Sequence, residues 1–78
     1  MIEISVKGPA RSYYEGMSNS ITLPGSNGQF QILTGHAPIL AQLKQGDIII
    51  ETDNGKKSIK INEGMLDFKG DCATVLVL

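Results

Sequence analysis

The sequence predicts an all-β domain, a sandwich or a barrel of many short strands, and three observations lead to this prediction. First, apolar residues recur with a period of two, since Ile2, Ile4 and Val6 alternate with polar residues. Second, turn-forming residues break the chain at short, regular intervals, which is typical of strands linked by tight turns. Third, nine glycines among 78 residues are too many for long helices, because glycine destabilises a helix interior.

The first half of the chain contains a regular strand, two close turns and one ambiguous segment. Residues 2–7 alternate apolar and polar side chains and predict a strand with one buried face. Two turn signals follow, at Pro24-Gly25 and Asn27-Gly28. A short apolar strand comes next. Residues 38–44 begin with proline, which suits a first helical turn, but they are short and soon reach Gly46. We therefore expect an extended loop or a strand there.

The second half contains the clearest hairpin prediction. Residues 48–50 are all isoleucine, and β-branched side chains favour a strand over a helix. Residues 47–52 and 57–62 flank the sequence Asp53-Asn54-Gly55-Lys56. Asn-Gly between two strands favours a type I′ turn, because both central residues of that turn need positive φ. The sequence therefore predicts a hairpin that turns at Asn54-Gly55.

The end of the chain predicts two more strands, separated by Gly70-Asp71. Residues 65–69 have a mixed pattern, whereas residues 74–78 are nearly continuously apolar. A continuous apolar run indicates a strand that is covered on one or both faces. Cys72 precedes this run, and we expect it to be a small, partly buried residue. As the only cysteine, it can form neither an internal disulfide nor a zinc site.

Composition and charge exclude several classes of function. A chain of 78 residues has room for one domain, over residues 1–78. The net charge of −1, with scattered charges, argues against a nucleic-acid surface or a polybasic membrane patch. The longest apolar run is far shorter than the about 20 residues of a membrane-spanning helix. The chain start also lacks the basic region of a signal peptide. We expect a cytosolic protein without direct membrane insertion.

The sequence offers little for catalysis, nucleotide binding or metal binding. His36 is the only residue of a type suited to acid–base work near neutral pH. Its possible nucleophiles, Thr34 and the more distant Ser26, do not lie in a Gly-x-Ser-x-Gly elbow. A single histidine without a cysteine nearby is a poor metal site. The turns also lack the Gly-x-x-x-x-Gly-Lys-Ser/Thr pattern of a phosphate-binding loop. We therefore predict no catalytic residue, no cofactor and no metal.

A family resemblance runs through the chain. Residues 23–28 read Leu-Pro-Gly-Ser-Asn-Gly, and residues 35–38 read Gly-His-Ala-Pro and precede aliphatic residues. Further matching pieces are Tyr-Glu-Gly at 14–16, Leu-Lys-Gln-Gly at 43–46, Glu-Gly-Met-Leu-Asp-Phe at 63–68 and Ala-Thr-Val-Leu at 73–76. In this order and spacing they resemble the N-terminal β-sandwich domain of the epsilon subunit of rotary ATP synthases. The resemblance covers essentially the whole chain.

The resemblance implies a flattened two-sheet sandwich of about eight to ten short strands. It also implies a noncatalytic central-stalk subunit of a proton-translocating ATP synthase, which links the gamma subunit to the c-ring. The residues expected to face gamma are His36, Pro38, Ile39, Leu40, Leu43 and Gly8. The turn expected to face the c-ring comprises Ser26, Asn27, Gly28, Gln29 and Gln31. The family often has an acidic residue at the position of Gln29, and a neutral side chain there would hydrogen-bond without an ion pair.

Most members of the family carry a C-terminal helical hairpin that binds ATP in some of them. This chain stops at Leu78, so we expect neither nucleotide binding nor inhibition by an inserted helix. The expected location is the cytoplasmic side of the bacterial inner membrane, peripheral to it.

Two other classes of function stay open. The first is a free-standing β-sandwich that binds a small ligand or a peptide. A deep pocket lined by Tyr13, Tyr14 or Phe30 would favour it, whereas an exposed apolar patch without a pocket would favour the rotor subunit. The second is an enzyme that uses His36, for which the sequence supplies no partner.

Overall fold

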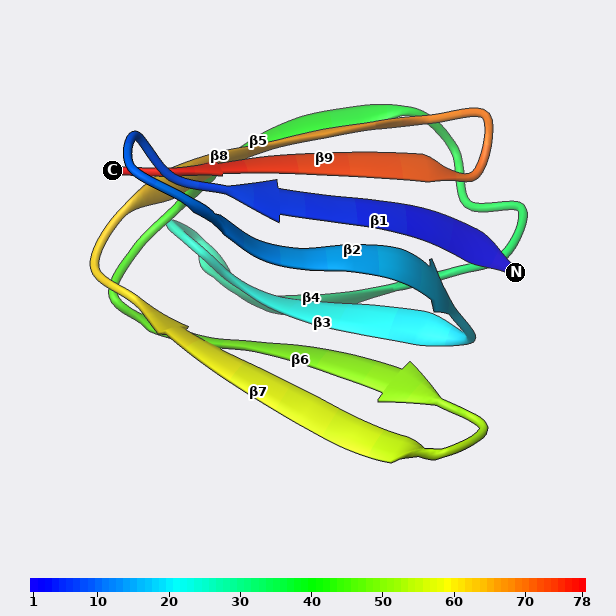
Figure 1. Cartoon of the computed structure of the whole chain (residues 1–78). Coiled ribbons are helices and arrows are strands. Elements are labelled where there is room, and N and C mark those ends of the chain that lie inside the picture. Colours follow the sequence, from blue (N-terminus) through cyan, green and yellow to red (C-terminus); the bar gives the residue numbers. More distant parts are fainter.

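The computed structural model describes residues 1–78 and contains nine strands and no helix (Figure 1). The strands are β1 (Ile2–Lys7), β2 (Ser12–Ser18), β3 (Ser20–Gly25), β4 (Gly28–Leu33), β5 (Ile39–Leu43), β6 (Gly46–Thr52), β7 (Gly55–Ile61), β8 (Gly64–Lys69) and β9 (Cys72–Val77). The ambiguous residues 38–44 thus contain β5. The structure includes no helical segment that could cross a membrane.

The strands form two layers that one hydrogen-bonded path connects. The first layer has the order β2-β1-β9-β8-β5, and the second has the order β4-β3-β6-β7. A single bridge between Gly25 of β3 and Leu43 of β5 joins the layers. The molecule measures 26 × 23 × 17 Å along its principal axes and is therefore flattened. This arrangement confirms the predicted two-sheet sandwich of short strands.

The inward faces of both layers supply one core of 16 buried apolar residues. In β1 the alternation places Ile2, Ile4 and Val6 inside, as the period of two predicts. On β8, Phe68 is the largest fully buried side chain. Because burial of a large apolar side chain contributes about 1.5–3 kcal/mol, this core holds the strands and their connecting loops in fixed positions.

The last strand lies in the middle of the first layer. It runs antiparallel to β8 and parallel to β1, so the two ends of the sequence form neighbouring strands. Ala73, Val75 and Val77 point into the core, whereas Leu76 is exposed, so the strand is covered on one face only. Cys72 is exposed and not partly buried as expected, because it shares the outer face with Leu76.

The type I′ turn lies at a different hairpin from the predicted one. The β6–β7 hairpin is present, but its turn residues are Asp53 and Asn54, and neither has positive φ. Gly55, which follows these two residues, is the one residue of this hairpin with a positive φ, at 124°. In the β8–β9 turn, Gly70 and Asp71 both have a φ of 56°, which is the requirement of a type I′ turn. Aspartate is one of the few side chains that accept this conformation.

Candidate functional site

The two layers leave two seams where their outer strands approach each other. The neutral seam lies between β4 and β5, as a groove of about 620 Å³ lined by residues 25–30 and 39–42, none of which is charged. The basic seam lies between β2 and β7, as a groove of about 360 Å³ lined by residues 11–13 and 57–60. Three of its seven lining residues are cationic and none is acidic. The two seams therefore differ in charge although both join the same two layers.

Backbone hydrogen bonds close one end of the neutral seam. Ser26 donates its backbone N–H to the carbonyl oxygen of Gln42 at 2.9 Å, and its hydroxyl donates to the same oxygen at 3.2 Å. The Lys44 N–H donates to the Pro24 carbonyl at 2.8 Å. Gly25 lies beside these bonds, where a Cβ would come within 2.7 Å of the Gly28 carbonyl oxygen. The β3–β4 turn is thereby fixed to β5.

The five residues predicted to face the c-ring lie on one hairpin. Ser26 and Asn27 form the β3–β4 turn, and Gly28 and Gln29 begin β4. All four are exposed. Gln31 lies farther along β4 on its outer face, where the side-chain amide donates to a serine hydroxyl of β3 at 3.5 Å. The structure therefore brings this predicted set together at the end of the molecule that carries the β3–β4 turn.

The loop that contains His36 connects β4 to β5 and is fastened to the first layer. The backbone N–H of Gly35 donates to a carboxylate oxygen of Asp71 at 2.8 Å, so the β8–β9 turn anchors the loop. The His36 ring packs edge-on against Phe68, with 5.9 Å between the ring centroids. Its Nδ1 donates to the Ala37 carbonyl oxygen at 2.6 Å, since a carbonyl can only accept. The contacts of His36 thus position the loop.

No group of three or more His, Cys, Asp or Glu side chains is placed to hold a metal ion. The His36 ring makes one hydrogen bond, to the backbone carbonyl oxygen of Ala37. It makes none to a hydroxyl group. The arrangement around His36 therefore offers packing and hydrogen bonding, and it contains no pair of nucleophile and base.

Strand β5 divides the residues predicted to face gamma. Leu40 is 72% exposed on the outer face, whereas Leu43 is 2% exposed and lies in the core. Ile39 is half-buried and packs against that core. Leu40 and Leu43 are an odd number of residues apart, and such residues point to opposite faces of a strand. The structure therefore places Leu43 inside and not on the expected surface, while the exposed Pro38 precedes Leu40 beside the loop.

Gly8 also lies apart from the other residues predicted to face gamma. It is in the connection between β1 and β2, and the strands β9 and β8 separate β1 from β5. A Cβ on Gly8 would come within 2.9 Å of the Tyr13 ring, which lines the basic seam. The structure therefore does not join Gly8 to the surface that contains His36 and Leu40.

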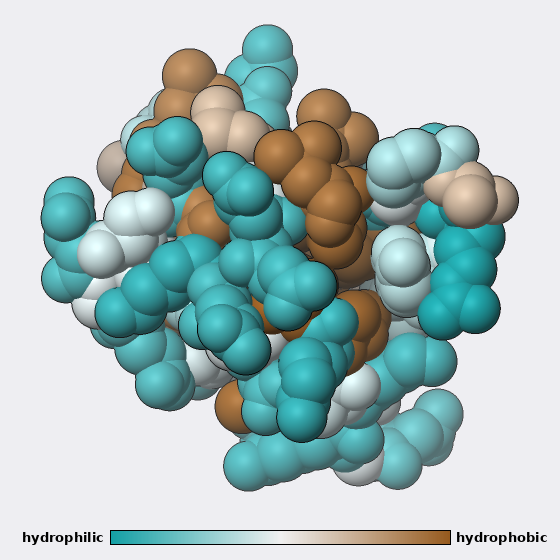
Figure 2. Space-filling view, turned by 90° about the vertical axis from the view of Figure 1, so that its left-hand side faces the viewer, coloured by the Kyte–Doolittle hydropathy of each residue, from teal (hydrophilic) through white to brown (hydrophobic).

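The outer face of the first layer exposes apolar side chains that the sequence predictions missed. Met65 of β8 lies directly opposite Leu76 of β9, and Leu78 follows on the same face. Figure 2 shows the end of the molecule near the C-terminus, where hydrophobic side chains gather mainly in the upper half. The strands of the first layer occupy this half in Figure 1. The nearly continuous apolar run of residues 74–78 could have indicated these exposed side chains. When only one face of such a strand is covered, every second apolar residue is exposed.

Comparison with known proteins assigns the domain to a family. Residues 1–78 match the model of the family described as the ATP synthase delta/epsilon chain, β-sandwich domain. The chain belongs to this family. The match includes the loop with His36 and the β3–β4 turn, so the resemblance seen in residues 23–28 and 35–38 is confirmed.

Relatives of this delta/epsilon domain include ATP synthase epsilon chains of several bacteria. The domain is 38% identical over 69 residues to the epsilon chain of Chlorobaculum tepidum. This alignment covers 87% of this chain and 78% of the Chlorobaculum protein. It is 37% identical over 76 residues to the epsilon chain of Helicobacter pylori, with 97% of this chain and 62% of that protein covered. The domain thus spans less than two thirds of the Helicobacter protein.

Solved structures share the fold of the delta/epsilon domain at lower identity. A chain from the Euglena gracilis mitochondrial ATP synthase, in a structure of OSCP, F1 and c-ring, superimposes with a TM-score of 0.89 and 19% identity. The alignment covers 97% of this chain and 49% of that one. A chain from the central stalk and c-ring of the Tetrahymena thermophila enzyme gives a TM-score of 0.80 at 18% identity, with coverages of 99% and 63%. Both likenesses support the nine-stranded sandwich.

Proposed function

We propose that this domain is a noncatalytic part of the rotor of an ATP synthase, where it links the gamma subunit to the c-ring. The observation that carries the proposal is the family match over residues 1–78, which includes both of the loops expected to meet these partners. In this role the domain transmits torque from the ion-driven ring to gamma. It lies on the cytoplasmic side of the bacterial inner membrane, within the membrane-associated complex.

The geometry of the neutral seam suits a part that contacts two partners at once. The β3–β4 turn, which would face the c-ring, is hydrogen-bonded through Ser26 to Gln42 of β5. The same strand carries Leu40, which belongs to the set predicted to face gamma and is 72% exposed. A load applied at the turn therefore reaches the gamma-facing strand through backbone bonds and not through a flexible loop.

The rest of the sandwich provides the rigidity that torque transmission needs. Of 49 backbone hydrogen bonds, 42 lie within the strand ladders, and the core between the layers is a single apolar cluster. Protein interiors are close-packed and have low compressibility, so the two contact surfaces keep their relative positions. Permanent subunit contacts also tend to be large and apolar, which agrees with the exposed Leu40 and Met65 on the first layer.

Calorimetry with the gamma subunit of the same source tests this proposal, using two matched variants. Leu40→Asp and Met17→Asp each place a carboxylate on the outer face of the first layer, at opposite edges. Each new carboxylate faces an existing acid on the neighbouring strand, since Leu40 pairs with Asp67 and Met17 pairs with Glu3. The cost of the like-charge pair in the folded state is therefore similar in both variants.

We expect the unaltered domain to bind gamma one to one with a negative heat-capacity change, the mark of apolar burial. Leu40→Asp should weaken binding by about tenfold or more, as loss of a central apolar contact does. Met17→Asp should change the affinity by less than about twofold, as a residue outside the contact would. Equal affinities of the two variants would show that gamma does not contact β5.

A further inference from the structure

The basic seam is bordered by two strand edges that no other strand covers. β2 and β7 are the two ends of the hydrogen-bonded strand order, and no backbone hydrogen bond joins one to the other. The peptide N–H and C=O groups on these edges therefore point into the groove or to solvent. An exposed strand edge is a template on which another extended segment can pair.

The two edges differ in regularity. β7 pairs with β6 in an unbroken register from Gly55 to Ile61. β2 contains an irregularity opposite Val6 and Lys7, where Tyr13 is the extra residue. Such a bulge interrupts the ladder and turns the edge away from regular pairing. The free edge of β7 is therefore the better platform for an added strand.

The groove between these edges presents cations that have no carboxylate partner. The Arg11 guanidinium lies over the Tyr13 ring, 4.7 Å from its centroid, and the Lys57 Nζ lies 5.8 Å from the centroid of the Tyr14 ring. The one ion pair of the structure is elsewhere, between Lys7 and Glu15. Aromatic faces thus hold the two cations in place, and their charges stay available to an incoming anion.

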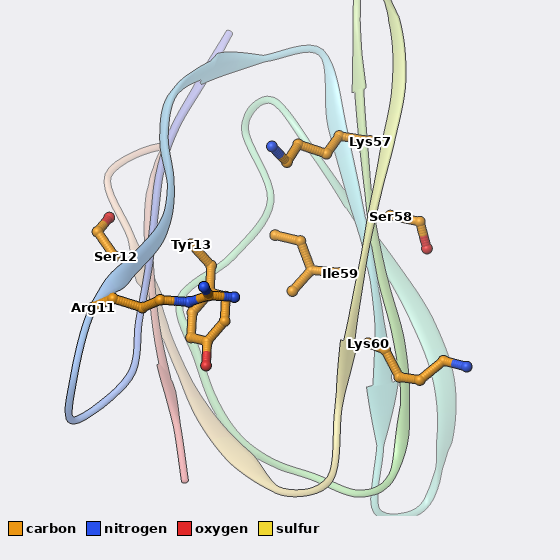
Figure 3. A pocket seen from close by; sticks show the side chains of 7 residues that line it. All are labelled: Arg11, Ser12, Tyr13, Lys57, Ser58, Ile59 and Lys60. Carbon is orange, nitrogen blue, oxygen red and sulfur yellow. The ribbon is translucent and has the colours of Figure 1, made fainter.

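The side chains alternate between the groove and the outside. In Figure 3, Lys57 and Ile59 of β7 point into the gap toward β2, whereas Ser58 and Lys60 point away from it. Ile59 is buried and, with the Tyr13 ring, gives the groove an apolar floor. An extended segment would match this floor and these cations if its groove-facing side chains, which lie two residues apart, included an acidic residue near Lys57 and an apolar residue near Ile59.

We propose that the basic seam binds an acidic segment of another protein in extended conformation, as a strand added to the free edge of β7. Backbone hydrogen bonds to β7 would supply the pairing, and carboxylates would meet Arg11 and Lys57. This site is separate from the neutral seam, so it does not depend on the rotor role. The competing explanation is that lysines on an edge strand prevent pairing, and the two explanations predict opposite results.

Amide NMR spectra of the isotope-labelled chain decide between them. The probe is an acetylated and amidated hexapeptide of sequence Thr-Glu-Thr-Val-Thr-Glu, in which glutamate and valine lie two residues apart on one face, and its control is the same peptide with glutamine in place of glutamate. We expect saturable shifts of the amides of β7 and β2 with the glutamate peptide, and much weaker shifts with the glutamine peptide. No shifts at millimolar peptide, or shifts centred on β4 and β5, would overturn the proposal.

Two lysine variants on the same strand make the test specific. Lys57→Gln should raise the dissociation constant of the glutamate peptide by roughly two- to fivefold, the effect of one exposed charge pair. Lys60→Gln removes the same charge from a side chain that points away from the groove, and it should leave the constant nearly unchanged. Equal effects of the two variants would overturn the proposal and indicate attraction by net charge alone.

The same spectra separate a strand from a simple anion. Inorganic phosphate and vesicles with anionic lipid are added to the labelled chain in parallel. Because neither can pair with a strand edge, they should leave the amides of β7 unshifted at concentrations where the peptide saturates. If either reproduces the peptide's shifts, the site recognises an anion and not an extended acidic segment, and the proposal is wrong.

Discussion

The neutral and the basic seam close the same sandwich in different ways. At the neutral seam, backbone bonds from Ser26 and Lys44 cross between the layers, and no lining residue is charged. At the basic seam no backbone bond crosses between β2 and β7, and two cations rest on two tyrosine rings instead. One seam is thus joined through the main chain, and the other presents charged side chains beside free strand edges.

The two seams therefore suit different purposes: the neutral seam stabilises the fold, and the basic seam offers unpaired groups to a partner. Main-chain bonds and a close approach at Gly25 make the neutral seam a fixed element, which suits a surface that must transmit force. The basic seam leaves its cations without a carboxylate partner and its strand edges unpaired, which suits a surface that acquires a partner. If this division is correct, equivalent substitutions at the two seams should have unequal effects on the free energy of unfolding.

The largest expected difference is between the two leucines of β5. Leu43→Ala should reduce the free energy of unfolding by about 2–5 kcal/mol, because it opens a cavity in the core. Leu40→Ala should change it by less than about 0.5 kcal/mol, since the side chain is exposed. Urea unfolding followed by circular dichroism measures both. Similar losses would mean that β5 does not alternate between core and solvent as the structure shows.

The next difference is between the glycines beside the two seams. In Gly25→Ala the new Cβ would lie 2.7 Å from a backbone oxygen and from the Phe30 ring, and this overpacking should cost about 1–3 kcal/mol. In Gly8→Ala it would meet only the edge of the Tyr13 ring, at 2.9 Å, and that side chain can rotate away. We expect less than about 1 kcal/mol there. Thermal unfolding of both variants checks the order, and a larger loss in Gly8→Ala would contradict it.

The smallest effect concerns the contact between Lys57 and Tyr14. A double-mutant cycle with Lys57→Met and Tyr14→Leu should give a coupling of about 0.5–1 kcal/mol, as for an exposed cation on an aromatic face. Lys60→Met serves as the control, because its side chain points away from the groove, and it should not couple to Tyr14. A coupling as large for Lys60 as for Lys57 would show that the effect comes from net charge.

Much of the fold could be predicted because alternation within a strand depends on local sequence. Residues 2–7 show their buried face directly, and the β6–β7 hairpin follows from two alternating runs around a turn signal. The turn type was less predictable. Gly70-Asp71 carries the type I′ geometry, although Asn54-Gly55 has the more typical sequence, because the strand ladders on either side decide which residues form the turn.

The candidate site was predictable in part, and the errors have a physical cause. A resemblance indicates which residues lie near a contact, but the face of each residue depends on its strand, and so Leu43 points inward. Which strands are neighbours depends on packing between distant segments. The parallel pairing of β1 with β9 is one such case, and the separation of Gly8 from Leu40 is another. The basic seam arises in the same way, since only the fold brings Arg11 near Lys57.

Hydrogen–deuterium exchange of the chain, alone and in complex with the gamma subunit, tests the central claim most directly. The claim is that the neutral-seam side of the domain, with β5 and the loop of His36, contacts the gamma subunit while the basic seam stays free. We expect slower exchange in residues 34–38 and in β5, with unchanged exchange in β2 and β7. Slower exchange in β2 and β7, without any change in residues 34–38, would contradict it.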